Sequence, residues 1–162
     1  RSRKQKGILA FLAQDAKTRV FCYANADLDK DTQNDEVLQF VKFWKQRTGR
    51  YPQELIFDSK LTTYKNLDKL NALKIGFMTL RRRSKPMLAQ IHKEPISAWR
   101  RIELQGVSRI YRRPKILDQK IVLKDYQEPI RQIVINELGR EAPIFLLTNQ
   151  QINQIHTVLL HR

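Results

Sequence analysis

Several features that are common in proteins are scarce in this sequence of 162 residues. It has one cysteine, Cys22, so it cannot form an internal disulfide or a Cys-type zinc site, and a reducing cytoplasm is the default location. Its five glycines form no cluster, which argues against a Walker or Rossmann phosphate loop. No apolar run approaches the ~20 residues that a membrane-spanning helix needs. These scarcities argue against a disulfide scaffold, a P-loop enzyme and a membrane span.

Acidic residues are also few compared with basic ones. The chain has 31 Lys and Arg against 16 Asp and Glu, a formal net charge of +15. Such an excess points to a polyanionic partner, most often nucleic acid. The alternative is a ribosomal-type or merely basic protein. The length suits one domain, with or without an insertion, and is sufficient for a hydrophobic core.

The first half of the chain alternates strand-like and helix-like segments. Residues 8–12 and 20–23 predict two strands around the turn "QDAKT", and residues 29–50 predict a helix that Thr32 or Asn34 caps and Gly49 ends. "PQELIFDS" then predicts a short buried strand, "TTYKNLDKLNALK" a second helix, and "IGFMTLRRR" another strand. This order predicts an α/β sheet with at least one parallel crossover and helices on both faces.

Residues 95–148 have a different pattern, with few helix signals. Segments such as "SAWRRIEL", "SRIYRRP", "QKIVLKDY" and "IRQIVINEL" alternate apolar with basic or polar residues and predict an antiparallel β insertion. "PIFLLTN" is expected to return to the main sheet, and a helix is expected to begin after Asn149. The predicted organisation is a core over residues 1–84, a β-rich insertion over 85–142, and a return strand with the start of a core helix over 143–162. The absence of an initiator Met and the stop at "HTVLLHR" indicate a piece of a larger protein.

Asp58 is the strongest single candidate for a catalytic or metal-binding residue. It follows the apolar run Leu55-Ile56-Phe57, and sites in open α/β sheets form outside the carboxyl ends of strands. A carboxylate there suits Mg²⁺ or Mn²⁺, and a pair of such ions can activate water and stabilise a leaving oxygen in phosphodiester chemistry. The alternative is that Asp58 accepts hydrogen bonds from free N–H groups where the next helix begins.

The other acids and the histidines do not complete a site. Asp15 lies in the predicted hairpin turn, where turn chemistry is expected. The acidic run before the first helix lacks the spacing of a calcium loop and predicts capping and solvated surface; its members are Asp27, Asp29, Asp31 and Asp35. The scattered histidines indicate neither a zinc site nor a Ser-His-Asp triad; they are His92, His156 and His161.

A basic segment, "TLRRRS", is the second candidate. Ten Lys or Arg and two acids lie between residues 81 and 113, interleaved with Trp99 and Tyr111, which is the composition of a nucleic-acid surface. Arginine forks bind phosphate in a bidentate way, but neighbours on a strand point to opposite sides, so Arg81, Arg82 and Arg83 cannot all grip one phosphate. The alternative is a solvated basic face with Trp99 in the core.

These phrases, read together, resemble a known family. "ILAFLAQD", "FVKFWKQRTGRYPQELIFDSKLTTY", "GFMTLRRR", "IRQIVINELGRE" and "PIFLLTN" resemble the central part of a DDE-type transposase of bacterial insertion sequences, over nearly the whole chain. The resemblance implies an RNase H-like mixed sheet with flanking helices and a β-rich insertion. It also implies three acids that bind two Mg²⁺ (or Mn²⁺), cleavage of DNA at the ends of the element, and joining of the freed 3′ hydroxyl to target DNA.

Position by position, the resemblance makes Asp58 the second acid, a catalytic residue and metal ligand. The first acid belongs on a strand before Gly7 and the third, a glutamate, on the helix after "PIFLLTN"; both are absent from this chain. The expected phosphate contacts are Lys60, Thr63, Arg81, Arg82 and Arg83. The expected partners are DNA at element ends and target, and a second copy in the intact parent, in the bacterial cytoplasm.

One carboxylate alone binds Mg²⁺ poorly, so the chain as given is expected not to catalyse transposition. Three alternatives stay open at this point. The first is a non-enzymatic nucleic-acid-binding module in which Asp58 only caps a helix. The second is an RNase H-like nuclease or resolvase that hydrolyses strands without joining them. The third is a decayed product with exposed sheet edges and no function.

Overall fold

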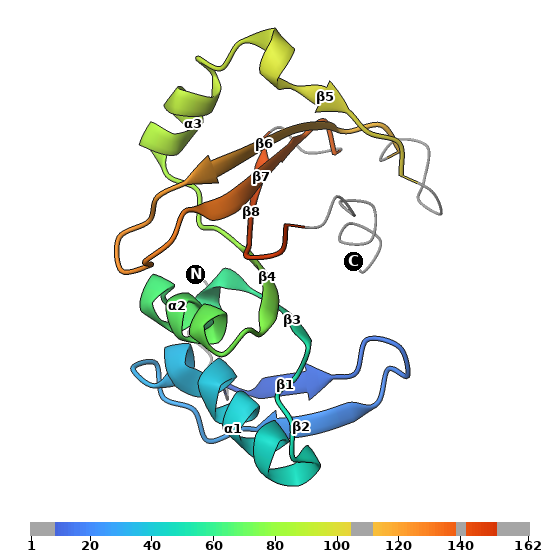
Figure 1. Cartoon of the computed structure of the whole chain (residues 1–162), viewed down its shortest axis with the longest axis vertical. Coiled ribbons are helices and arrows are strands. Elements are labelled where there is room, and N and C mark those ends of the chain that lie inside the picture. The colour runs from blue at the N-terminus through green and yellow to red at the C-terminus, as the bar shows by residue number, and fades with distance from the viewer. Residues whose placement is uncertain (1–8, 105–111, 139–141, 152–162) are drawn as a thin grey trace, which may run out of the picture.

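A computed structural model of the chain (Figure 1) describes residues 9–104, 112–138 and 142–151. It is a mixed α/β protein with a two-stranded sheet, β1-β2, and a six-stranded mixed sheet in the order β3-β4-β8-β7-β6-β5. The strands are β1 (Phe11–Gln14), β2 (Phe21–Asn25), β3 (Glu54–Phe57), β4 (Gly76–Leu80), β5 (Arg100–Arg101), β6 (Lys115–Ile121), β7 (Ile130–Asn136) and β8 (Ile144–Thr148). The helices are α1 (Glu36–Thr48), α2 (Tyr64–Ala72) and α3 (Lys85–Ile91), with short 3₁₀ turns η1 (Gln33–Asp35), η2 (Ser59–Leu61) and η3 (Ile96–Ala98).

The hairpin and the first helix form as the sequence predicts. β1 and β2 pair antiparallel, and Asp15 holds their turn by accepting hydrogen bonds from the backbone N–H of Lys17 and Thr18. Gly49 ends α1 with a φ of 77°, a left-handed conformation that glycine adopts without steric cost. The predicted cap at the start of α1, Thr32 or Asn34, is wrong. Asp35 precedes α1 and makes no side-chain capping hydrogen bond, Thr32 lies before η1, and Asn34 lies within η1.

Among the described residues, the strand before Asp58 lies at the edge of the sheet and none of its residues is buried, so the prediction that it is buried is wrong. β3 pairs in parallel with β4 across the α2 crossover, which confirms the predicted parallel unit. Within the described residues β3 has no neighbour on its other side. Its side chains alternate between the two faces, as in any strand, with Leu55 and Phe57 turned to the core and Ile56 51% exposed on the other face. A continuous apolar run of three residues does not distinguish an edge strand from a central one.

The insertion extends the same sheet. β8 lies antiparallel beside β4, as expected for "PIFLLTN", and β7, β6 and β5 follow in antiparallel order. The strand-rich prediction missed α3, although Ser84 caps it by accepting a hydrogen bond from the backbone N–H of Met87 and Pro86 occupies its first turn. The tail helix and most of "SRIYRRP" lie outside the described residues.

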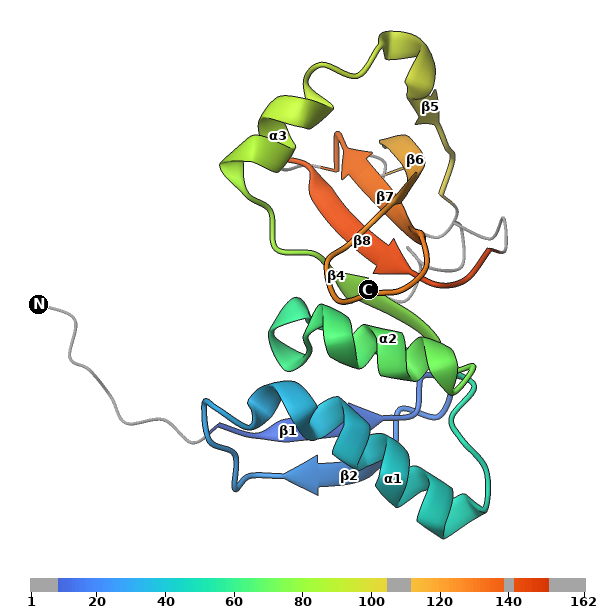
Figure 2. The same cartoon turned by 60° about the vertical axis from the view of Figure 1, so that its left-hand side comes forward.

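Three hydrophobic clusters hold these layers together. The largest joins the hairpin, α1 and α2 to one face of the sheet and contains Phe11, Phe40, Leu70 and Phe77. Figure 2 shows α2 between the sheet above it and the hairpin with α1 below it. A second cluster lies around Ile116, Ile133, Ile135 and Leu146, and a third lies under α3 with Phe145 and Trp99.

The loop between β6 and β7 ties the insertion to α2. Leu123 and Tyr126, each 5% exposed, belong to the same cluster as the residues of α1 and α2. Next to them, the backbone N–H of Gln127 donates to Asp68 of α2 over 2.9 Å. The insertion is thus anchored to the first half of the chain by packing as well as by strand pairing. Among the described residues, no helix is long and apolar enough to cross a membrane.

Candidate functional site

Asp58 lies at the carboxyl end of β3, where the sequence predicted it. Phe57 pairs with Thr79 of β4, so Asp58 emerges beside the carboxyl end of that strand. Its Oδ1 atom accepts hydrogen bonds from the backbone N–H of Lys60 (3.0 Å) and from the hydroxyl of Ser59 (3.2 Å), which makes it the cap of η2. The side chain is exposed. Asp58 thus caps η2 and is also exposed at the end of a strand, so its position fits both alternatives.

The described residues do not make a Mg²⁺ site around Asp58. No group of three or more His, Cys, Asp or Glu side chains that could hold a metal occurs among them. Mg²⁺ takes six oxygen ligands in near-ideal octahedral geometry, and a single exposed carboxylate does not select it from water. The side chains present therefore do not fit the two-metal centre that the family resemblance implies, and no catalytic step follows from them.

The acids nearest in the fold have structural partners. η1 lies against η2, and the carboxylate of Asp35 accepts a hydrogen bond from Asn66 of α2 over 2.7 Å. Glu36, which is buried, accepts from the hydroxyl of Tyr23 (2.7 Å) and the amide of Asn25 (2.9 Å). Burial, and then the neighbouring Glu36 carboxylate, raise the pKa of Tyr23 to about 12. These two acids fasten α1 to α2 and to β2.

The residues expected to contact phosphate have different surroundings. Lys60 is exposed beside Asp58, and its backbone N–H is taken up by the cap. Thr63 is exposed and caps α2, because its hydroxyl oxygen accepts a hydrogen bond from the backbone N–H of Asn66 over 3.2 Å. Both lie within five residues of Asp58, so they share its end of the sheet. Phosphate contact by either residue stays a prediction.

The three consecutive arginines, Arg81 to Arg83, have different surroundings, as expected for neighbours at the end of a strand. Arg81 is half-buried and turns into the fold, where its guanidinium donates to the hydroxyl of Tyr64 (3.2 Å) and to the amide oxygen of Gln132. Both partners are neutral, and no carboxylate among the described residues forms an ion pair with Arg81. Arg82 and Arg83 are exposed. These two side chains are therefore free to meet a polyanion, while Arg81 also holds α2 against the sheet.

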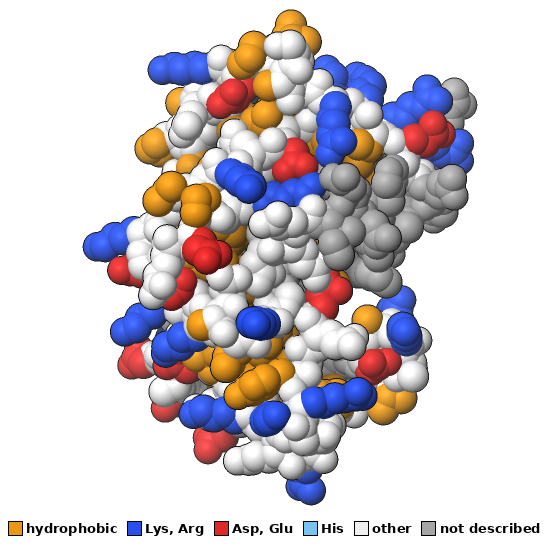
Figure 3. Space-filling model, in the orientation of Figure 1, with side chains coloured by type: hydrophobic (Ala, Val, Ile, Leu, Met, Phe, Trp, Pro, Cys, Tyr) orange, Lys and Arg blue, Asp and Glu red, His pale blue; other side chains and the backbone are white. Residues whose placement is uncertain are grey.

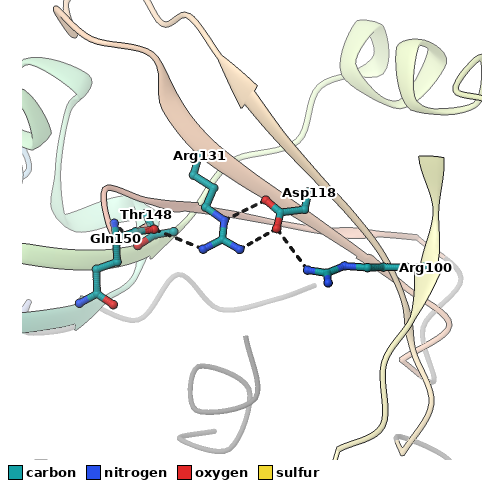
Figure 4. A network of polar contacts seen from close by, with 5 residues as sticks. All are labelled: Arg100, Asp118, Arg131, Thr148 and Gln150. Atoms are coloured by element: carbon teal, nitrogen blue, oxygen red, sulfur yellow. Dashed lines mark hydrogen bonds and ion pairs between the residues drawn. The ribbon is translucent and has the colours of Figure 1, made fainter. Parts of the chain in front are cut away.

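Two charged clusters were not anticipated from the sequence. In the first, Arg131 of β7 donates from two nitrogens to Asp118 of β6, at 2.8 and 2.6 Å, while Arg100 of β5 approaches the same carboxylate at 3.4 Å (Figure 4). The hydrogen bonds from Arg131 hold the pKa of Asp118 below its usual range. In the second, Glu137 lies between Arg101 and Lys115, at 2.8 Å from each. Only knowledge of which strands pair could have revealed them.

A polar groove of about 340 Å³ lies at the opposite end of the sheet from Asp58. Asn71, Tyr126, Thr148 and Asn149 are among its lining residues. It contains part of the Asp118–Arg131 cluster, whose charges already satisfy each other. The groove and the predicted metal site therefore do not coincide.

The excess of positive charge is concentrated between residues 81 and 124. Residues 81–124 contain thirteen Lys or Arg against three acids, whereas residues 9–80 contain eleven against nine. Figure 3 shows a group of Lys and Arg side chains (blue) at the upper right of the molecule, where β5 lies in Figure 1, and others spread over the left and lower parts of the same face. Trp99 is half-buried in the cluster under α3, as in the alternative that placed it in the core, and Tyr111 lies outside the described residues.

In comparisons with known proteins, no protein-family model matches the chain and no curated protein matches its sequence. The arrangement of Asp58 and of the basic residues therefore carries the argument about function.

Proposed function

We propose that this chain is the central part of a DDE-type DNA transposase with an RNase H-like core, and that on its own it binds DNA without cutting it. The observation that carries the proposal is the β3-α2-β4 unit. It presents Asp58 at the end of one parallel strand and Arg82 and Arg83 after the end of its neighbour. A carboxylate beside cations at a shared strand end is the arrangement expected where a phosphodiester meets a metal-binding acid.

The free edge of β3 supports the same proposal. Within the described residues, β3 pairs only with β4 and β1 only with β2, yet both strands turn side chains into one hydrophobic cluster. On their other faces, Leu12 is 59% and Ile56 51% exposed. A further strand paired with β3 would cover apolar surface and would bring its own last residue beside Asp58. The first acid that the resemblance implies belongs on such a strand.

Metal-dependent cleavage and strand transfer belong, in this proposal, to a protein that also supplies the first and third acids. The cofactor would be Mg²⁺ or Mn²⁺, the partners would be the element ends and target DNA, with a second copy of the parent, and the location would be the bacterial cytoplasm. Detectable Mg²⁺-dependent nicking or joining by this chain, abolished by Asp58→Ala, would contradict the part of the proposal that makes it inactive alone.

DNA binding is tested by removing charge from one place and then from another. The triple variant Arg82→Gln, Arg83→Gln, Lys85→Gln should lose about 100-fold in affinity for a short DNA duplex near 0.1 M salt, because up to three phosphate contacts disappear. The slope of log K against log salt should become shallower by up to about 2.7. Fluorescence anisotropy across a salt series measures both.

The matched control removes the same charge from the helices of the first half. Lys42, Lys65 and Lys69 are exposed on α1 and α2, and their triple change to Gln should cost much less affinity. Equal losses in the two triple variants would mean that DNA responds only to net charge, and the proposed surface would be wrong.

A non-enzymatic nucleic-acid-binding module is the second candidate, and the cap that Asp58 forms on η2 favours it. Salt dependence does not separate the two functions, since both use phosphate contacts. A longer version of the protein separates them. Metal-dependent products that vanish with Asp58→Ala support the transposase, and their absence supports the module. Hydrolysed products without joined ones would instead indicate a nuclease.

A further inference from the structure

Glu137 occupies an unusual position at the end of β7. Its backbone has a φ of 61°, in the left-handed region that side chains with a Cβ seldom adopt. Its two carboxylate oxygens meet different cations, Oε2 with Arg101 and Oε1 with Lys115, each at 2.8 Å. One acid at a strand end thus spans two basic side chains from other strands.

Strand pairing explains how the two cations come together. Asn136, the last residue of β7, pairs with Lys115 of β6, and Lys115 pairs with Arg101 of β5. The cations are therefore neighbours on adjacent strands. Glu137 reaches them directly after β7 ends, in a left-handed conformation that departs from the alternation of the strand. Lys115, and then Arg101, hold the pKa of Glu137 below its usual range, so it carries its charge at neutral pH.

This ion-pair cluster lies on the outer, accessible part of the basic insertion. The side chains of Arg101 and Glu137 are 54% and 41% exposed, so the carboxylate can leave without any unfolding. Arg113 is close by, since its carbonyl oxygen accepts a hydrogen bond from Arg101 over 3.0 Å. Its own acidic partner, Glu103, is 3.5 Å away. Three cations therefore face two acids around one strand edge.

A phosphodiester and a carboxylate bind to the same kind of basic site. Each carries one negative charge and offers two oxygens, and an arginine fork pairs with either. We propose that Arg101 and Lys115 form a phosphate-binding cradle which Glu137 fills in the free protein, and that a nucleic-acid backbone binds there by displacing this carboxylate. The inference rests on the proposed DNA binding and adds where on the insertion a phosphate lies and what competes with it.

The experiment removes the competing charge. Glu137→Gln should bind a short fluorescein-labelled DNA duplex about fivefold more tightly at low salt, which corresponds to the loss of one like charge at contact distance in water. The slope of log K against log salt should change little, because the wild-type chain makes the same phosphate contact once the carboxylate has moved away. In the Glu137→Gln background, Arg101→Gln together with Lys115→Gln should abolish the gain in affinity and make the slope shallower by about 0.9, the value for one lost phosphate contact.

Two further variants make the test specific. Glu54→Gln removes one negative charge from the exposed first residue of β3, away from the cradle, and should change affinity and slope little. Glu137→Gly also removes the carboxylate and suits the left-handed backbone, so it should reproduce the gain even where the Gln variant folds poorly.

The outcomes separate the two proposals. A wild-type chain without salt-dependent DNA binding would overturn the proposed function, and the inference with it. Salt-dependent binding in which Glu137→Gln, Glu137→Gly and Glu54→Gln behave alike would leave DNA binding in place and overturn the cradle.

Discussion

The two halves of this molecule use their acids differently. Among the described residues, the five ion pairs all lie between residues 100 and 137. Residues 9–80 hold nine acids and eleven cations, yet within the described part of the chain they form no ion pair. Their acids accept hydrogen bonds from backbone N–H groups and neutral side chains instead, as Asp15, Glu36 and Asp58 do.

The two halves thus differ in whether their acids lie against Lys and Arg side chains. In the first half, acids cap turns and helix ends, and the formal charges of residues 9–80 are nearly balanced. In the insertion, Glu103, Asp118 and Glu137 each lie against cations. The insertion, residues 85–142, has twelve basic residues against seven acids, so an excess of positive charge remains there. Packing, by contrast, joins the halves, through the loop that carries Leu123 and Tyr126.

The largest expected effect comes from cutting that connection. Tyr126→Ala should lower the free energy of unfolding by about 3 kcal/mol, because a buried aromatic ring is replaced by a cavity. It should also uncouple the two halves. The chain has two tryptophans, Trp44 in the aromatic cluster of α1 and Trp99 under α3, so each half has its own probe. The variant Trp44→Phe keeps only Trp99, which reports on the second half, and Trp99→Phe keeps only Trp44, which reports on the first half. Urea unfolding of these two variants, followed by tryptophan fluorescence, therefore measures one half at a time.

With Tyr126 present, the two fluorescence transitions should coincide, as they do in a two-state protein. With Tyr126→Ala, they should separate. Val122 in the same loop is 80% exposed, so Val122→Ala serves as the control and should cost under about 0.5 kcal/mol. If Tyr126→Ala behaves like Val122→Ala, the loop does not connect the halves.

A smaller effect sharpens the contrast in how acids are used. Asp118 has a pKa below that of an unfolded chain, chiefly because Arg131 donates hydrogen bonds to it. Its stabilising contribution is therefore complete above about pH 4, the usual aspartate value, and is lost as pH falls through the lower folded-state pKa. Asp118→Asn should cost about 1 kcal/mol at pH 7, as expected for a partly exposed pair.

Thermal unfolding of wild type and Asp118→Asn over a pH series measures this contribution. The difference in stability should shrink on acidification and vanish below the folded-state pKa of Asp118. Asp29→Asn, a change of an exposed acid in the first half, should show almost no difference at any pH. A difference for Asp118→Asn that is independent of pH would mean that packing, rather than charge, makes residue 118 matter.

Much of this fold could be predicted from local patterns. The hairpin, the parallel β3-α2-β4 unit and the return strand β8 follow from apolar periodicity, turn residues and Gly49. Burial of β3 was predicted wrongly, because whether a strand lies at an edge depends on which other strands are present. The helix α3 was not predicted although Ser84 and Pro86 mark its start, because the basic run that precedes them continues the strand pattern of "IGFMTLRRR".

The candidate site was predictable only where one residue carries the signal. Asp58 could be located at a strand end because three apolar residues precede it. The role of Glu137 could not be found in this way. Its partners are 36 and 22 residues earlier in the chain, at Arg101 and Lys115, and strand register alone brings them together. Cross-strand contacts of this kind depend on register, which no single segment specifies.

The smallest expected effect concerns Asp58 and decides what this carboxylate does in the chain as it stands. As a cap of η2, it should tolerate Asp58→Asn with a loss under about 0.5 kcal/mol, because an amide oxygen accepts the hydrogen bond from the Lys60 N–H equally well. Asp58→Ala removes the acceptor and should cost about 1 kcal/mol. Urea unfolding with and without Mg²⁺ separates the cap from a metal ligand. A cap shows the same order of stabilities in both conditions. A rise in wild-type stability with Mg²⁺, absent from both variants, would show that Asp58 binds the ion without the other two acids, and that the first half of this chain holds more of a metal site than its described side chains present.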